Sequence, residues 1–405
     1  MALSNAQLLM LDNLIYFDGC QDDCTVEEII NRIEKKWEND ETFTGSLMDH
    51  TETGSFIAMV KKDKTLMNYT VKNYHQDSTG MRAACFVDDQ DNPTDVNVVF
   101  RGTVESYEWG DNAKGAFLSD TEIQKKAANY IKTVSKSYGD YLTVTGHSKG
   151  GNLAQYVAIF TDSIARCVSF DGQGFSREFI EKYKDEIKKR ANSIVSISAS
   201  GDYVNCLLYP IAGSRIYIEN EPQKDFIKNH SPFILLDENG NLRREGKQSD
   251  LSKLINDYTT YLLSSLDGPE RAIAYQGLIK ILESGDPPKT IWEDLYVGFI
   301  ALSHIDDFSF NYIGETYGFP AELCASFVAA VACPYLFMDD LANCGFEMVD
   351  GILNGMRSLA NVINERLNAF GEKAKEFGKN FVNGIASFAS GVKESYNMLF
   401  NRGYR

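Results

Sequence analysis

The feature that most restricts the fold is a regular alternation of strand-like and helix-like segments in the first half of the chain. The strand-like segments are residues 81–87, 96–100, 141–145, 165–170 and 193–198. The helix-like segments are residues 121–137, 152–160 and 178–190. Thr25 with Glu28 has the pattern of a capping box at a helix start, and Ser119 with Glu122 is predicted to cap the segment from residue 121. Strands that alternate with helices form a parallel sheet with helices on both faces. The sequence therefore predicts an α/β fold with a mostly parallel central sheet.

The second half of the chain has a different pattern, because helical segments follow one another there without a convincing strand. From residue 349 to residue 392, apolar residues recur every three or four positions, which is the spacing of one helix face. We predict an α/β core, a helical extension packed on that core, and a C-terminal all-helical region. The predicted bounds of these parts are residues 1–245, 246–310 and 311–405.

The net charge argues against one class of partner, and the first residues of the chain predict a location. The net charge of −17 argues against a nucleic-acid partner, because a polyanion would be repelled. The first residues show no basic segment before their apolar stretch, so we predict no secretory leader and a cytoplasmic location. The eight cysteines are then expected to be reduced thiols. Cys20 and Cys24 lack a second Cys or His pair at a matching spacing, so no metal site is predicted.

The sequence G-H-S-K-G at residues 146–150 lies between a β-branched strand segment and a helix segment. A serine hydroxyl is a weak nucleophile unless it is exposed, oriented and next to a base. A tight turn from strand to helix presents the serine, and glycines flank it because a Cβ would clash with nearby backbone. We therefore predict Ser148 as a catalytic nucleophile. The alternative is an ordinary glycine-rich turn between a strand and a helix.

A nucleophilic serine needs a histidine base, which follows it along the chain in this arrangement. Of the five histidines, two precede the serine, and His147 adjoins it with its side chain directed away. His304 lies in an apolar helical stretch, where a packed or surface histidine is expected. His230 lies in a loop-like stretch, and loops beyond the sheet commonly carry functional groups. We therefore predict His230 as the base.

The remaining roles belong to segments that follow strands. Asp202 closes a strand-like run and is predicted as the acid that orients the base. Asp171 follows the preceding strand and is the alternative acid, although a turn or helix-cap role also fits it. An oxyanion would be held by the N–H of Lys149 and by Thr103, which offers a backbone N–H and a hydroxyl at the end of another strand.

Two segments together, Phe100-Arg101-Gly102-Thr103 and G-H-S-K-G-G from residue 146, resemble the class 3 (fungal-type) lipases. They resemble more closely the bacterial lipase-like relatives of these enzymes, a family of unknown function. The resemblance covers roughly residues 1–300 and implies the α/β-hydrolase fold. It also implies Thr103 as an oxyanion residue, Ser148 as the nucleophile, and Asp202 as the acid of a D-x-V segment.

Two positions depart from the lipase pattern. Lys149 stands where the lipases have an apolar residue. The stretch after Thr103 carries Trp109-Gly110-Asp111-Asn112 in place of a long apolar lid. Both departures favour a smaller or more polar acyl substrate.

The expected activity is that of a serine hydrolase that cleaves a carboxylic ester through an acyl-enzyme, as lipases and esterases do, without a metal or organic cofactor. The expected substrate is a small-molecule or lipid ester. A second hypothesis is a catalytically vestigial hydrolase-fold protein whose C-terminal helices bind a membrane surface or a protein partner. From residue 342 onward that region carries 8 Lys and Arg against 6 Asp and Glu, a slight positive balance in an acidic chain.

Overall fold

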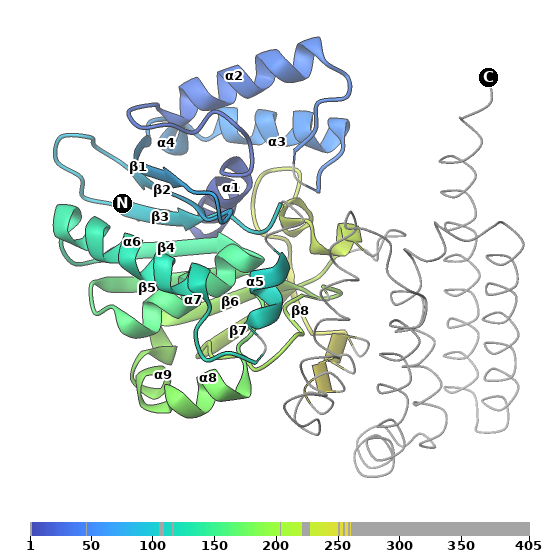
Figure 1. Cartoon of the computed structure of the whole chain (residues 1–405). Helices are drawn as coiled ribbons and strands as arrows, with labels where there is room; N and C mark the ends of the chain where they lie inside the picture. Colours follow the sequence, from blue (N-terminus) through green and yellow to red (C-terminus); the bar gives the residue numbers. More distant parts are fainter. Residues whose placement is uncertain are drawn as a thin grey trace, which may run out of the picture. The chain divides into compact units, whose positions relative to one another are not determined.

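The computed structural model describes residues 2–260 apart from 46, 105–108, 116, 203, 221–226, 250–251, 254–255 and 258–259 (Figure 1). The chain divides into two compact units, Met1–Thr260 and Tyr261–Arg405, of which the first contains all the described residues. The predicted helical extension and C-terminal helical region lie almost wholly outside the described residues. These parts and the predicted boundaries at 245 and 310 stay predictions.

Eight strands form one sheet in which each strand lies beside the next one in the sequence. They are β1 (Thr70–Gln76), β2 (Arg82–Val87), β3 (Val96–Phe100), β4 (Leu142–His147), β5 (Ile164–Phe170), β6 (Ile194–Ala199), β7 (Ser214–Ile218) and β8 (Glu245–Gly246). Neighbours from β3 to β7 are parallel, whereas the pairs at both edges are antiparallel. The predicted α/β fold with a mostly parallel sheet is confirmed, and the five predicted strands are present.

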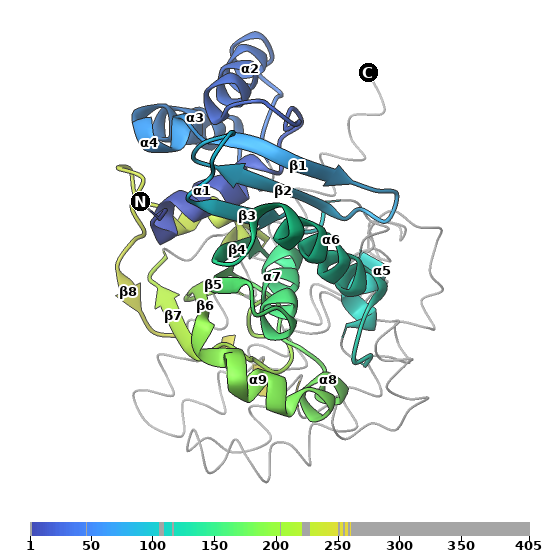
Figure 2. The ribbon, with the colours of Figure 1, turned by 90° about the vertical axis from the view of Figure 1, so that its left-hand side faces the viewer.

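The connections from β3 to β6 carry helices, and right-handed crossovers between consecutive parallel strands return on one side of the sheet. These connections contain α5 (Trp109–Lys114), α6 (Glu122–Tyr138), α7 (Lys149–Phe160), α8 (Arg177–Lys182), α9 (Lys184–Arg190) and the short 3-10 helix η2 (Ala191–Ser193). Figure 2 shows α6 and α7 in front of the strands. The core on this face joins strand residues such as Val98 and Val144 to Ile131 of α6 and Leu153 of α7.

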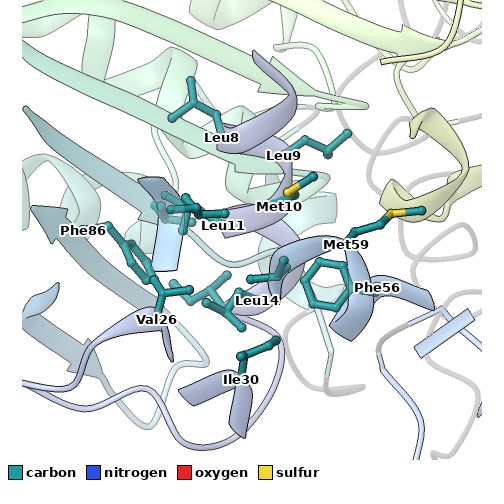
Figure 3. Packing of buried hydrophobic residues seen from close by; sticks show 14 of the residues in the cluster. Leu8, Leu9, Met10, Leu11, Leu14, Val26, Ile30, Phe56, Met59 and Phe86 are labelled. Atoms are coloured by element: carbon teal, nitrogen blue, oxygen red, sulfur yellow. The ribbon is translucent and has the colours of Figure 1, made fainter. Parts of the chain in front are cut away.

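The opposite face is covered by helices that precede the sheet in the sequence. They are α1 (Asn5–Leu14), α2 (Val26–Asn39), α3 (His50–Lys62) and α4 (Lys64–Met67). Figure 3 shows Leu11 and Leu14 of α1 among Phe86 of β2, Ile30 of α2 and Phe56 of α3, all of them buried. This second core fixes the end of α1, so the segment that follows α1 is held against the sheet.

The predicted start of α2 is present, whereas the start of one other helix and the continuity of a third differ from prediction. The capping box of Thr25 and Glu28 at the start of α2 is confirmed. The start of α6 is capped by Thr121 with Gln124, not by Ser119, although both positions carry the hydroxyl that a cap needs. The single helix predicted for residues 178–190 is two helices, because the chain leaves helical geometry at Tyr183. No helix in the described part of the chain combines the length and apolar character that crossing a bilayer requires.

Two short 3-10 helices, η3 (Ile227–His230) and η4 (Pro232–Leu235), follow β7 and bring the chain back towards α1. His230 is therefore the last residue of η3. The predicted loop-like character of this stretch is replaced by two single turns of tight helix. Such turns are short enough to place one side chain at the end of the sheet without adding a further layer.

Candidate active site

Ser148 occupies a strained turn between β4 and α7. Its backbone has φ 59° and ψ −125°, a conformation that L-residues rarely adopt and that costs on the order of 1–3 kcal/mol. The turn is held because the Ser148 N–H donates to the carbonyl of Phe170 at 2.9 Å. A Cβ at Gly146 would lie 2.3 Å from the carbonyl carbon of Gly150, and one at Gly150 would lie 2.0 Å from the carbonyl oxygen of Phe100. The two glycines therefore allow a close approach that another residue would block.

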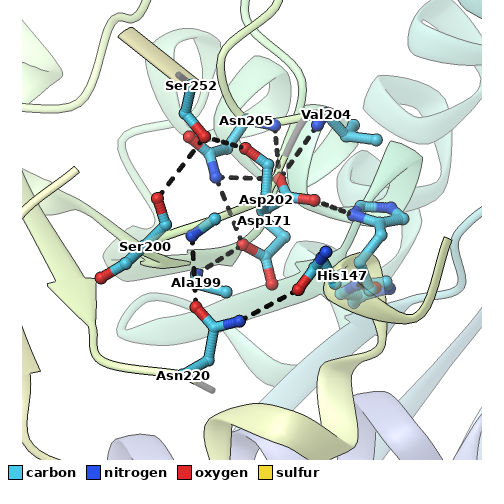
Figure 4. Close-up of polar contacts among 12 residues, drawn as sticks. His147, Asp171, Ala199, Ser200, Asp202, Val204, Asn205, Asn220 and Ser252 are labelled. Atoms are coloured by element: carbon cyan, nitrogen blue, oxygen red, sulfur yellow. Dashed lines mark hydrogen bonds and ion pairs between the residues drawn. The ribbon is translucent and has the colours of Figure 1, made fainter. Parts of the chain in front are cut away.

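His230 and Asp202 form a buried pair at the carboxyl end of the sheet. The Nδ1 atom of His230 lies 2.7 Å from Oδ1 of Asp202, and the two residues are 4% and 0% exposed. The other oxygen, Oδ2, accepts the N–H groups of Val204 and Asn205 and the side-chain amide of Asn205, at 3.1, 2.7 and 2.8 Å (Figure 4). Since three donors hold Oδ2, the orientation of Oδ1 towards the imidazole is fixed.

His147 joins the serine turn to the His230 segment. Its Nε2 lies 2.9 Å from the carbonyl oxygen of His230, and its Nδ1 lies 2.9 Å from the hydroxyl of Tyr16. A carbonyl oxygen only accepts, so Nε2 carries the hydrogen and Nδ1 accepts from the tyrosine. Burial, and then the neighbouring His230, hold the pKa of His147 well below its usual range. His147 therefore stays neutral, and it fixes the backbone of His230 beside the serine turn.

The segment around Thr103 passes directly next to Ser148. A Cβ at Gly102 would lie 3.0 Å from Cβ of Ser148 and 2.7 Å from the carbonyl oxygen of His147. The hydroxyl oxygen of Thr103 accepts a hydrogen bond from the side-chain amide of Asn112 at 2.8 Å. Because the amide is the donor, the hydroxyl hydrogen of Thr103 remains available for another acceptor.

Lys149 directs its side chain to α5. Its Nζ lies 2.8 Å from Oδ2 of Asp111, and the two side chains are 6% and 11% exposed. Asp111 also accepts the hydroxyl of Thr121 at 2.7 Å. Burial alone would raise the pKa of Asp111, but the Lys149 ammonium and these hydrogen bonds outweigh it and lower that pKa. An ion pair therefore attaches α5 to the residue that follows Ser148.

Asp171, the alternative acid, lies beside the same pair. It directly follows β5, has φ 46° and is fully buried. Its Oδ1 accepts the N–H of Ala199 at 2.8 Å and the amide of Asn205 at 3.5 Å. Burial, and then the nearby Asp202, raise the pKa of Asp171 well above its ordinary value. The two aspartates that the sequence offered as alternatives thus lie in one site.

One group of potential metal ligands occurs among the described residues. His147, Asp171 and His230 each offer one ligand atom, and these atoms lie within 4.8 Å of one another. Both nitrogens of His147 are already engaged by Tyr16 and by the His230 carbonyl. A metal would have to break one of these contacts, so the donor set fits a hydrogen-bonded site better than a metal site.

The predicted site residues converge, and three partners were missed. Thr103, Ser148, Lys149, Asp202 and His230 all belong to segments that meet at the carboxyl end of the sheet. The missed partners are Tyr16, Asn112 and Asp111, which reach the site from outside the motifs. The other described histidines lie elsewhere: His50 stacks on Trp37 and His75 lies on β1. His304 lies outside the described residues.

The sequence model of the Mbeg1-like family matches residues 59–279, more than half of the chain. The chain belongs to the Mbeg1-like family. The matched range of this Mbeg1-like chain includes every predicted site residue, from Thr103 to His230. The predicted relation to lipase-like proteins is confirmed.

A curated relative of this Mbeg1-like chain is the extracellular phospholipase A1 of Serratia liquefaciens, 28% identical over 116 residues. The match covers 28% of this chain and 34% of the phospholipase, so the chain spans about a third of the length of that relative. The solved structures to which this chain is similar include the Lip2 lipase of Yarrowia lipolytica. That match has 12% sequence identity and a TM-score of 0.35, and it covers 61% of this chain and 88% of the lipase. The native Rhizomucor miehei lipase propeptide complex matches with 14% identity and a TM-score of 0.28, over 54% and 83%.

The predicted cytoplasmic location is wrong by this comparison, because the curated relative is an extracellular enzyme. The prediction rested on the first residues of the chain alone, and these report on one export signal only. Among the described cysteines, Cys20, Cys24, Cys85 and Cys167 are free and buried. Buried apolar surroundings explain these thiols without reference to a compartment.

Proposed function

We propose that this Mbeg1-like protein is a serine hydrolase that cleaves a carboxylic ester through an acyl-enzyme intermediate. The observation that carries the proposal is the buried pair of His230 and Asp202, at 2.7 Å, joined through His147 to a serine on a strained strand-to-helix turn. A nucleophile, an acid and a base are the parts that acyl transfer requires, and Ser148, Asp202 and His230 follow one another along the chain in that order.

In the proposed reaction, Oγ of Ser148 attacks the carbonyl carbon of the ester while His230 takes the hydroxyl proton. Asp202 holds the imidazole in one tautomer and stabilises the imidazolium that forms. The C–O bond to the leaving alcohol then breaks, and His230 gives the proton to the leaving alkoxide. Water then attacks the acyl carbon while the same imidazole takes a proton from it. The bond between the acyl carbon and Oγ of Ser148 breaks, the acyl group leaves as a carboxylic acid, and the imidazolium returns the proton to Oγ.

The negative charge that develops on the carbonyl oxygen would be held on the Thr103 side of the turn. The proposed donors are the N–H groups of Thr103 and Lys149 and the hydroxyl of Thr103. The hydrogen bond from Asn112 supports the hydroxyl in this role, because the hydroxyl oxygen accepts from the amide and its hydrogen points elsewhere. The N-terminal end of α7 adds a favourable dipole.

The proposed substrate is a lipid or small-molecule carboxylic ester. A relative that is a phospholipase A1 supports an acyl ester of a phospholipid as one candidate. The buried ion pair of Lys149 and Asp111 lies beside the serine turn. An apolar wall at this position would favour long acyl chains, whereas the ion pair supports a substrate with a polar group near the reacting carbon. A panel of p-nitrophenyl esters of graded chain length, together with phosphatidylcholine vesicles, would separate these substrates.

The test of the reaction is covalent labelling by a fluorophosphonate, which reacts with an activated serine. Wild-type protein is expected to label, and Ser148→Ala is expected to lose the label because the attacking oxygen is gone. Ser55→Ala, which removes an exposed hydroxyl on α3, is the matched control and should label like wild type. A folded Ser148→Ala protein that still labels, or a wild-type protein that does not, would contradict the proposal.

A further inference from the structure

The carboxyl ends of β5 and β6 bring two aspartates to the same histidine. The two strands are parallel neighbours, with Phe170 opposite Ile197, so the residues that follow them emerge at one edge of the sheet. Asp171 follows β5 directly, and Asp202 lies three residues after β6. A carboxyl oxygen of Asp171 lies within 4.8 Å of a ring nitrogen of His230. Figure 4 shows Asp171 and Asp202 side by side next to His147.

The hydrogen bonds of Asp171 engage only one of its two oxygens. Oδ1 accepts the N–H of Ala199, and the amide of Asn205 spans both carboxyl groups, at 2.8 Å from Asp202 and 3.5 Å from Asp171. Oδ2 is buried and has no hydrogen-bond partner among the described residues. Burying an acceptor without a partner is energetically unfavourable. A purely structural contact to Ala199 would need a single oxygen, which an asparagine also provides.

The backbone of Asp171 adds a second cost. Its φ of 46° lies in the left-handed region, which aspartate and asparagine tolerate better than most residues. Together with the partnerless oxygen, this conformation presents a carboxyl group to the two imidazoles at the end of the sheet.

We propose that Asp171 is a reserve acid of this site, able to orient the protonated His230 in place of Asp202. The inference rests on the proposed function, because it assigns a positioning role within the same reaction. Asp202 holds this role in the native protein, since its oxygen is at 2.7 Å and its second oxygen is fixed by three donors. Asp171 takes it when the nearer carboxylate is removed and the imidazolium attracts the remaining acid.

The protonation of Asp171 gives the reserve role a recognisable pH dependence. Burial is the main reason that the pKa of Asp171 is raised, and the charge of Asp202 is the second. Among the described residues, the titratable groups that face it are Asp202, His147 and His230. Without Asp202 the burial remains, so Asp171 still ionises above the usual aspartate range. Because only the ionised form stabilises an imidazolium, activity that depends on Asp171 rises with pH.

The experiment compares Asp202→Ala with the double variant Asp202→Ala/Asp171→Asn, by ester hydrolysis and by the rate of fluorophosphonate labelling. Loss of the primary acid is expected to lower kcat by roughly 10⁴-fold. Adding Asp171→Asn is expected to remove roughly a further tenfold, the factor of one hydrogen bond to a charged group. The same Asp171→Asn change in the wild-type background is expected to cost less, because Asp202 is then present. Residual activity of Asp202→Ala should rise with pH, and that of the double variant should not.

Equal activities and equal pH profiles for Asp202→Ala and the double variant would overturn the reserve role. Thermal unfolding of each variant checks the fold, and Asp202→Asn with and without Asp171→Asn repeats the comparison with an oxygen retained for the N–H groups of Val204 and Asn205. A wild-type protein that fails to label at Ser148 would instead overturn the proposed function. The two failures are therefore distinguishable.

Discussion

On one side of Ser148 the His230 segment is held by hydrogen bonds of a neutral histidine and a fixed carboxylate, whereas on the other side α5 is held by a buried ion pair. The first side depends on Tyr16, His147 and the N–H groups around Asp202. The second depends on the charges of Lys149 and Asp111 and on one amide of Asn112. The side of the proposed base (the base side) is thus set by hydrogen-bond geometry, while the side of the proposed oxyanion donors (the oxyanion side) is set mainly by charge. Removing single groups should separate the two.

The largest effect on the oxyanion side is expected from Thr103→Val. Valine keeps the shape of the side chain but removes the hydroxyl, so one proposed donor to the oxyanion is lost and Asn112 loses its acceptor. Loss of one such donor lowers kcat by about 10²–10³-fold in comparable sites. Steady-state kinetics with a p-nitrophenyl ester measures it. Thr103→Ser, which keeps the hydroxyl, is the control and should retain most of the activity; equal kcat for Thr103→Val and wild type would remove the hydroxyl from the mechanism.

The next effect concerns the ion pair. Lys149→Met leaves Asp111 buried without its cation, and breaking a buried pair in this way lowers the free energy of unfolding by about 3–5 kcal/mol. Lys189→Met, which breaks an exposed pair with Asp162 whose side chains are 68% and 78% exposed, should change stability by less than about 1 kcal/mol. Chemical unfolding measures both variants. Similar small losses for the two would show that the buried pair contributes no more than the exposed one.

The same pair has a defined pH dependence. The pKa of Asp111 is lowered in the folded protein, so the pair stabilises the fold above the ordinary aspartate pKa of 3.8 and loses this contribution as the pH falls through the lowered pKa. In Lys149→Met burial raises this pKa instead, so the stability difference between wild type and variant should narrow as the pH falls, first through the raised pKa of the variant and then through the lowered pKa of the wild type. A stability difference that stays constant on acidification would show that Asp111 is not the group whose charge is stabilised.

The smallest effect is expected on the base side, from Tyr16→Phe. The change removes the hydroxyl that donates to Nδ1 of His147, so His147 is less firmly held in the tautomer that binds the His230 carbonyl. Loss of one hydrogen bond that aligns His147 should lower kcat by roughly 3–10-fold and leave KM unchanged. Tyr74→Phe, which removes a tyrosine hydroxyl of β1 that donates to Gln76, is the control. A change in KM alone would indicate a substrate contact in place of a positioning role.

Local sequence patterns were sufficient for the sheet and for the serine turn. Strand-like runs, the glycines at 146 and 150, and the cap at Thr25 each act over a few residues, so they can be read without the fold. His230 was reached by elimination among five histidines, and its role as the base stays a prediction; in the structure its imidazole contacts Asp202, 28 residues earlier in the chain.

Contacts between distant segments could not be predicted in the same way. Tyr16 and His147 are 131 residues apart, and nothing in either local sequence indicates the other. The two aspartates were treated as alternatives because chain order assigns the acid to one strand, whereas the ends of neighbouring strands converge. The cap of α6 was misplaced because Ser119 and Thr121 carry the same local signal, and only Thr121 also reaches Asp111.

The order of the strands also determines when a chain under synthesis contains the residues of the proposed site. Each new strand finds its partner already made, so the sheet grows by additions of low sequence separation. A nascent chain that ends at residue 200 contains the whole serine turn, yet it lacks both Asp202 and His230. Under the proposed function, the attacking hydroxyl is thus synthesised before the proposed base and acid, and an incomplete copy still attached to the ribosome would lack the groups needed to attack an ester.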